Sequence, residues 1–259
     1  MVLRALVGCL LIGAFSNALA AERATLRRPE KFSPAVQKAV EKDIKLANDH
    51  FAQVYRDQSS LEKMVPKSLT LVNAAAQKTW AHPSVKAALK ALPPIDVRVV
   101  MAWRDAELPT TGYAGSTIHV LAEDLRVIKT IDELAFIIIH ETAHHSLGHL
   151  FLKHQKETAN GEVSESFFQE LEIEADQMAT YILADVGLNP RAGLTVLENA
   201  AEYIGDRISA RHKSLMLSLA KERRASLEAF IKKESFADVK SSGETDVQAM
   251  QAELKQIFR

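Results

Sequence analysis

One stretch, IIIHETAHHSLGH at residues 137–149, constrains this chain more than any other. It places charged and imidazole side chains directly after three isoleucines. The preceding run, Leu134–Ile139, is apolar on every side of a helix, which is typical of a buried helix. Burying a Glu or His without a partner costs several kcal/mol or drives the group to its neutral form. The chain must therefore supply a partner for these side chains in its interior.

The spacing of HETAH favours a metal ion as that partner. Residues four apart lie on one face of an α-helix, so His140 and His144 can present two ring nitrogens to one zinc ion. Glu141 lies about 100° round the helix from His140, where it reaches a metal-bound water more easily than the metal. The pattern predicts two ligands and a general base. The alternative is an incidental motif on a helical binding module.

A third ligand is expected from the segment ELEIEADQMATYILADVG at residues 170–187. In a helical projection, Glu172 and Asp176 fall beside the apolar stripe, so Glu172 is the best inward-facing carboxylate. Two His and one Glu leave a fourth position open, as a catalytic zinc site requires. Asp176 is expected to accept the second N–H of His140 and orient the ring.

The segments DELAFIIIHETAHHSLGH (132–149) and ELEIEAD (170–176) resemble the gluzincin zinc metallopeptidases related to CAAX prenyl endopeptidases and HtpX-type proteases, in particular the soluble, exported BepA-like branch. The pattern of that family, H-E-x-x-H followed by E-x-x-A-D, also places the third ligand on Glu172 and the supporting acid on Asp176. The resemblance implies a zincin-like fold with one zinc ion per chain. A family His-Pro segment followed by Arg is matched only in part, because His212 and Arg223 or Arg224 are present without the Pro. His212 is thus a candidate transition-state donor or plug of the cleft.

The predicted function is that of a zinc-dependent endopeptidase that cleaves exported or envelope proteins, for example in quality control. Glu141 is the predicted catalytic base, and the substrate is expected to bind as an extended strand beside Ser116–Ala122. The alternative is a non-catalytic zinc-binding chaperone or adaptor of the envelope on a peptidase fold. Nearly equal numbers of basic and acidic residues, 32 and 33, give no indication of nucleic-acid binding.

The expected fold class is α+β, mostly helical, with a small sheet next to the active-site helix. Strands are predicted at 95–103 and 116–122, with a loop at 104–115 between them. Thr130 or Asp132 can cap the motif helix. If that helix continues, His145 and His149 point away from the ligand face, and the remaining histidines are not expected to be ligands. Helices are predicted from Pro34 to about residue 92, with interruptions at Pro66 and Pro83, and at 164–186, 191–204 and 209–232.

The first twenty residues have the layout of a secretory signal, with cleavage after Ala20. Their apolar run is shorter than the roughly 17–25 residues that span a bilayer. The alternative is a lipid anchor at Cys9. Cys9 is the only cysteine of the chain, so no disulfide is expected within the mature protein. The prediction is an exported, periplasmic protein with a metallopeptidase domain at 21–232 and a polar C-terminal tail at 233–259, of which at most the last dozen residues form a weak helix.

Overall fold

The computed structural model describes residues 31–63, 65–91, 95–100, 112–114, 116–199, 210–241 and 243–257. The predicted signal peptide and Cys9 lie outside these residues. Among the described helices, none combines the length and the apolar character that a membrane span requires.

The described part of the chain is mostly helical and contains one small sheet. The prolines predicted to interrupt the N-terminal helices do so, because α3 begins at Pro66 and α4 at Pro83. The helices are α2 (Pro34–Glu62), α3 (Pro66–Trp80), α4 (Pro83–Ala91), α5 (Ala122–Leu125), α6 (Ile131–Ser146), α7 (His149–Asn160), α8 (Glu165–Asp185), α9 (Ala192–Glu198), α11 (Ala210–Glu234) and α12 (Glu244–Ile257).

The sheet has three strands in the order β1-β3-β2. Strands β1 (Asp96–Val100) and β3 (Thr117–Leu121) are parallel, and β2 (Gly112–Ala114) runs antiparallel to β3. The prediction of a loop over 104–115 is wrong for β2, a three-residue strand with no β-branched side chain. Because β3 is paired on both sides, the predicted pairing of a substrate beside Ser116–Ala122 is also wrong. Among the strands that the structure describes, β2 forms the edge on this side of the sheet.

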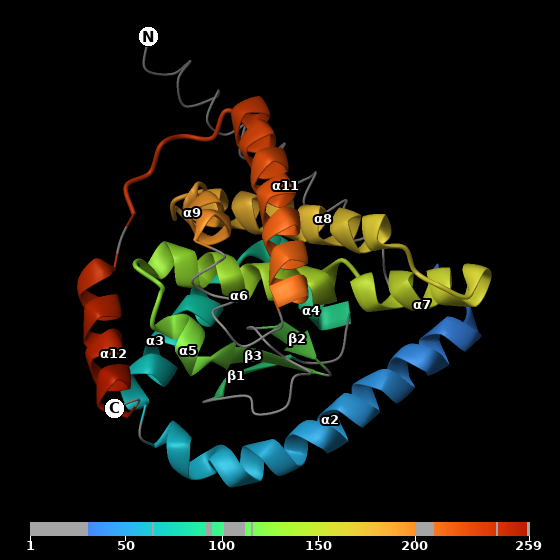
Figure 1. Cartoon of the computed structure of the whole chain (residues 1–259), viewed down its shortest axis with the longest axis horizontal. Coiled ribbons are helices and arrows are strands. Elements are labelled where there is room, and N and C mark those ends of the chain that lie inside the picture. Colours follow the sequence, from blue (N-terminus) through green and yellow to red (C-terminus); the bar gives the residue numbers. More distant parts are fainter. Residues whose placement is uncertain are drawn as a thin grey trace.

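Helix α6 carries the HETAH motif through the centre of the molecule, between the sheet and α8 (Figure 1). Its N-cap is Thr130, whose hydroxyl accepts a hydrogen bond from the backbone N–H of Glu133. The helix ends at Ser146, and Gly148 then adopts a left-handed conformation with a φ of 68°. The motif helix therefore does not continue, and the chain changes direction into α7.

Helices α8, α9 and α11 cover the other side of α6 (Figure 1). The α9–α6 contact requires a glycine, because a Cβ on Gly193 would lie 2.3 Å from the Phe136 ring and 2.9 Å from a methyl group of Leu227. The ring of Phe136 in turn lies beside His140, with ring centroids 6.2 Å apart. Packing of α9 thus bears directly on the ligand helix.

The C-terminal segment, predicted as a polar tail, folds into the main core. Helix α12 buries Val247, Met250 and Leu254, whose spacing places them on one helical face. The Glu253 carboxylate caps the first turn of α3 by accepting hydrogen bonds from the backbone N–H groups of Lys67 and Ser68, at 3.0 and 2.9 Å. Residues 244–257 are therefore part of the same folded unit as the motif helix.

Helix α2 is held by a second, smaller apolar cluster. Phe32, Val36 and Val40 are buried against partly buried residues, mainly of α7, and none of them belongs to the main core. Two polar contacts add to this cluster, since Asp43 lies 2.8 Å from Nε2 of His154 and Asn48 accepts the backbone N–H of Ser116 at 3.0 Å. In Figure 1, α2 is the long helix that starts near the end of α7 and passes along the outer side of the sheet.

Candidate metal centre

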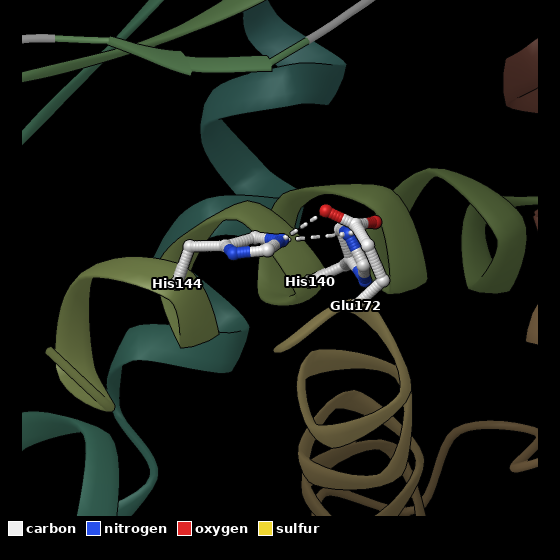
Figure 2. A group of neighbouring side chains, drawn as sticks. All are labelled: His140, His144 and Glu172. Carbon is white, nitrogen blue, oxygen red and sulfur yellow. Dashed lines mark hydrogen bonds and ion pairs between the residues drawn. The ribbon is translucent and has the colours of Figure 1, made fainter. Parts of the chain in front are cut away.

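Three side chains predicted as ligands converge between α6 and α8 (Figure 2). The Nε2 atoms of His140 and His144 are 3.1 Å apart. Glu172 reaches both rings, with Oε2 3.3 Å from His140 Nε2 and Oε1 3.3 Å from His144 Nε2. His140, His144 and Glu172 therefore form a group that can hold a metal ion.

The dimensions of this group suit a tetrahedral centre. Ligand bonds of about 2.0–2.1 Å in a tetrahedron place neighbouring donor atoms roughly 3.3–3.4 Å apart. The two Nε2 atoms, 3.1 Å apart, are close to such an edge, and Glu172 places one carboxylate oxygen 3.3 Å from each ring, Oε2 at His140 and Oε1 at His144. A group of two imidazoles and one carboxylate also leaves the fourth vertex to a non-protein ligand, as in catalytic zinc sites.

Asp176 and Arg223 support the ligands from behind. Asp176 is 1% exposed, and its Oδ1 lies 2.9 Å from Nδ1 of His140, the contact that the helical projection predicted. Arg223 on α11 binds Asp176 in a two-pronged contact of 2.8 and 2.7 Å, and its Nη1 lies 2.8 Å from Oε2 of Glu172. Each carboxylate that faces His140 is thus also held by a guanidinium.

These contacts shift the pKa values of the site. Burial alone would lower the pKa of His140, but the hydrogen bond and charge of Asp176, with a further hydrogen bond from Glu172, outweigh it and raise the pKa to about 10. Burial opposes ionisation of Glu172, yet the charges of His144 and Arg223 hold its pKa well below the ordinary value. The pKa of Asp176 is likewise lowered, because Arg223 outweighs the effect of burial. Without metal, the centre is therefore a network of charged groups.

Glu141, the predicted base, lies beside the ligands and is held by the sheet. Its Oε2 accepts the backbone N–H of Tyr113 on β2 at 2.8 Å. Burial raises the pKa of Glu141, although the charges of His140 and His144 counteract part of the effect. A carboxylate with a raised pKa is a stronger proton acceptor than an ordinary one.

His149 is positioned by the break at Gly148, which the projection of a continuous helix did not include, whereas His145 lies within α6 itself. His149 is buried and faces the ligand His144, with their Nδ1 atoms 2.9 Å apart. Nε2 of His149 lies 3.6 Å from Oε2 of Glu174. When His144 uses Nε2 for a metal, its Nδ1–H can donate to His149, whose own proton then faces Glu174. His145 contacts the Tyr113 hydroxyl at 2.6 Å, so it supports the strand that holds Glu141.

The other sequence candidates lie apart from the ligands or cannot be placed. His212 falls within α11, but its side chain is outside the described part of the structure. Arg224 contacts Glu198 and Glu228, so of the two candidate arginines it is Arg223 that reaches the centre. His82 is buried against Asp185, with Nε2 3.0 Å from Oδ2.

The centre opens into a cleft with a volume of about 850 Å³. Seven helices and strand β2 contribute described residues to its lining, and the three candidate ligands, Glu141, His149 and Arg223 all face it. Such a volume lies in the upper part of the range of small-molecule sites, which is roughly 300–1,000 Å³. A scan against models of protein families gives no match to this chain, and a search of curated proteins gives none.

Proposed function

We propose that this protein is a zinc-dependent endopeptidase with a zincin-like fold. The observation that carries the proposal is the convergence of His140, His144 and Glu172 on one point between α6 and α8, with a carboxylate of raised pKa, Glu141, beside them. The order of a small sheet, a motif helix and a second ligand helix supports the fold assignment. The resemblance of residues 132–149 and 170–176 to gluzincin peptidases points to the same chemistry.

The residues of the centre divide into ligands and proton carriers. Two imidazole nitrogens and a carboxylate oxygen would hold the ion, and a zinc ion bound there supplies Lewis acidity for hydrolysis. Within the described structure, no hydrogen bond to Oε1 of Glu141 is found, while Oε2 is fixed by Tyr113. Oε1 is therefore the atom that takes a proton from the attacking water and passes it to the leaving amine.

The edge of the sheet suggests how a peptide is aligned. Strand β2 lies at an edge of the sheet as far as the strands are described, and the backbone N–H of Tyr113 points away from β3 and donates to Glu141. Tyr113 also lines the cleft. An extended substrate would add to this edge by backbone hydrogen bonds, which position the peptide bond without regard to its side chains. We further propose export to the periplasm, where envelope proteins would be the substrates.

Glu141→Gln tests the proposed reaction. The variant keeps the shape of the side chain but cannot accept the proton, so we expect metal content equal to that of the wild type and loss of casein cleavage by several hundred-fold or more. Glu170→Gln is the matched control, since Glu170 is an exposed carboxylate on α8 that does not line the cleft. Metal is measured by mass spectrometry after dialysis, and cleavage is measured with and without chelator.

Two outcomes would overturn the proposal. Undiminished cleavage by Glu141→Gln would remove the assigned base. Zinc bound at one ion per chain, with no hydrolysis by the wild type of casein or of any peptide in a mixed library, would favour the non-catalytic chaperone or adaptor.

A further inference from the structure

The cleft has an apolar wall on each side of the metal centre. The wall formed by α6, α9 and α11, here called the α11 wall, consists of Phe136, Val196, Leu197, Met216, Leu219 and Ala220. The wall formed by α2, α7 and α8, here called the α2 wall, consists of Ile44, Leu46, Ala47, Leu150 and Phe168.

The two walls flank the ligands along the direction of α6. Phe136 lies one turn before His140, and its ring is 6.2 Å from the His140 ring. At the other end, His149 contacts His144, and Leu150 follows it directly. Phe136 and His144 are separated by roughly 12 Å of helix, which an extended peptide covers in three to four residues. The walls therefore lie where the side chains on either side of a centrally placed peptide bond would fall.

The α2 wall shows apolar surface that a folded protein normally buries. Among the residues whose exposure is described, Leu46 and Phe168 are the large apolar side chains left exposed, at 56% and 43%. Both line this cleft, although they come from different helices. Exposed apolar side chains that gather in one concave site are typical of a binding surface.

Polar groups at the same cleft favour a peptide over a free hydrocarbon chain. Asp43, Lys153, Glu165 and Gln169 line it together with the two walls. Asp43, Lys153 and Gln169 already contact His154, Glu157 and Glu222, but their charged and amide groups keep further hydrogen-bonding capacity for backbone amides. A hydrocarbon chain has no group that uses this capacity.

We propose that the cleft selects polypeptides that carry a bulky apolar side chain, such as Leu, Phe or Met, on each side of the bond to be cleaved. Phe168 and Leu46 determine the preference on one side, and the α11 wall determines it on the other. As a statement about substrates, this inference rests on the proposed endopeptidase function, although the binding preference can be measured without hydrolysis. Sequences of this kind are normally buried in folded proteins, so an unfolded or extended chain presents them best.

The test compares two labelled decapeptides of equal length and charge, one with Leu-Phe and one with Ser-Gln at the centre. Binding to zinc-loaded Glu141→Gln is followed by fluorescence anisotropy, which needs no turnover. We expect the apolar peptide to bind about tenfold tighter or more, as burial of even one such side chain implies. Phe168→Ala and Leu46→Ser should each weaken the apolar peptide about five- to tenfold and leave the polar peptide unchanged.

Phe167→Ala is the matched control, because Phe167 is the neighbouring ring on α8 and does not line the cleft. Equal affinity for the two peptides, tighter binding of myristate than of the apolar peptide, or equal loss in Phe167→Ala and Phe168→Ala would overturn the inference. Wild-type cleavage of both peptides at one rate would refute the preference while the proposed function stands. An apolar preference in binding without hydrolysis by the wild type would refute the function while the binding site stands.

Discussion

Replacement of Asp176 by Asn should change how many protons leave the protein when zinc binds. In the metal-free wild type, the pKa of His140 is about 10, so the ring is protonated at pH 8 and must lose that proton before Nε2 can bind a metal. Asp176 is the main cause of the raised pKa, and burial and Arg223 oppose it. In Asp176→Asn the pKa should therefore fall towards or below the ordinary value of 6.5, which leaves the ring neutral at pH 8.

The expected magnitude is one proton and a steep pH dependence. Between pH 7.5 and 9, the logarithm of the zinc dissociation constant should fall by one unit more per pH unit in the wild type than in the variant. At pH 7, about three pKa units separate the pH from the pKa of His140, so deprotonation costs on the order of 4 kcal/mol of apparent zinc affinity. The same contact with Asp176 that lowers the apparent zinc affinity also fixes the position of the His140 ring.

Isothermal titration calorimetry in buffers of different ionisation enthalpy measures the released protons directly. At pH 8 the wild type should release about one proton more than Asp176→Asn. Asp185→Asn is the control, because it makes the same change on the same helix at a remote His–Asp pair, Asp185 with His82. Equal proton release by wild type and Asp176→Asn would show that Asp176 does not set the charge of His140, and the account of the supporting acid would fail.

The remaining predictions concern stability and the support of the ligands. In the metal-free protein, the stability due to the charged His140–Asp176 pair is complete below pH 6.5 and is lost as the pH rises through about 10, so the thermal midpoint should fall over that window and be restored by zinc. Gly193→Ala forces the Phe136 ring to move and should cost about 1–3 kcal/mol in urea unfolding; a loss below about 0.5 kcal/mol would mean that the ring yields freely. His149→Ala should weaken zinc about 10- to 100-fold in chelator competition, whereas an unchanged dissociation constant would remove its orienting role. Glu253→Ala should lower the free energy of unfolding by about 1 kcal/mol through loss of the α3 cap, while the zinc affinity stays constant. A loss of zinc affinity together with stability would show that the cap and the candidate metal centre are coupled.

The ligand set was predictable from sequence because it depends on helical periodicity. His140 and His144 are one turn apart on α6. The helical projection of residues 170–187 places Glu172 and Asp176 together beside the apolar stripe, and this needs no information on how the two helices pack. In the structure His140 contacts each of the other three, and Glu172 also contacts His144. Helix geometry is sufficient for this prediction, because two residues four positions apart on one helix always point to the same side of it.

Other parts of the site depend on contacts that local geometry does not encode. His149 faces His144 because Gly148 takes a left-handed conformation. Glycine adopts left- and right-handed conformations about equally readily, so the sequence does not predict which one occurs at residue 148. Arg223 reaches the centre from α11, 47 residues after Asp176. The sequence alone did not distinguish it from the neighbouring Arg224. The strand β2 has only three residues and owes its conformation to pairing with β3.

The fold was predicted in outline, with its largest error at the C-terminus. The strands at 96–100 and 117–121 and most helix boundaries lie close to the predicted ranges, because their apolar patterns and prolines are strong signals. Helix α12 appeared polar because three buried residues in a segment of that length give a weak pattern. Its burial depends on a surface provided by α3, which is remote in sequence.

The separate anchoring of α2 has a consequence for how this protein can change over evolutionary time. The side chains that fix α2 share no member with those that fix the ligand helices. A substitution confined to the apolar cluster of α2 and α7 therefore alters the surface around Leu46 while the core that holds α6 and α8 is kept, whereas a substitution at Asn48 also reaches the sheet through Ser116. Natural variation in this cluster can thus change the proposed substrate preference separately from the candidate metal centre.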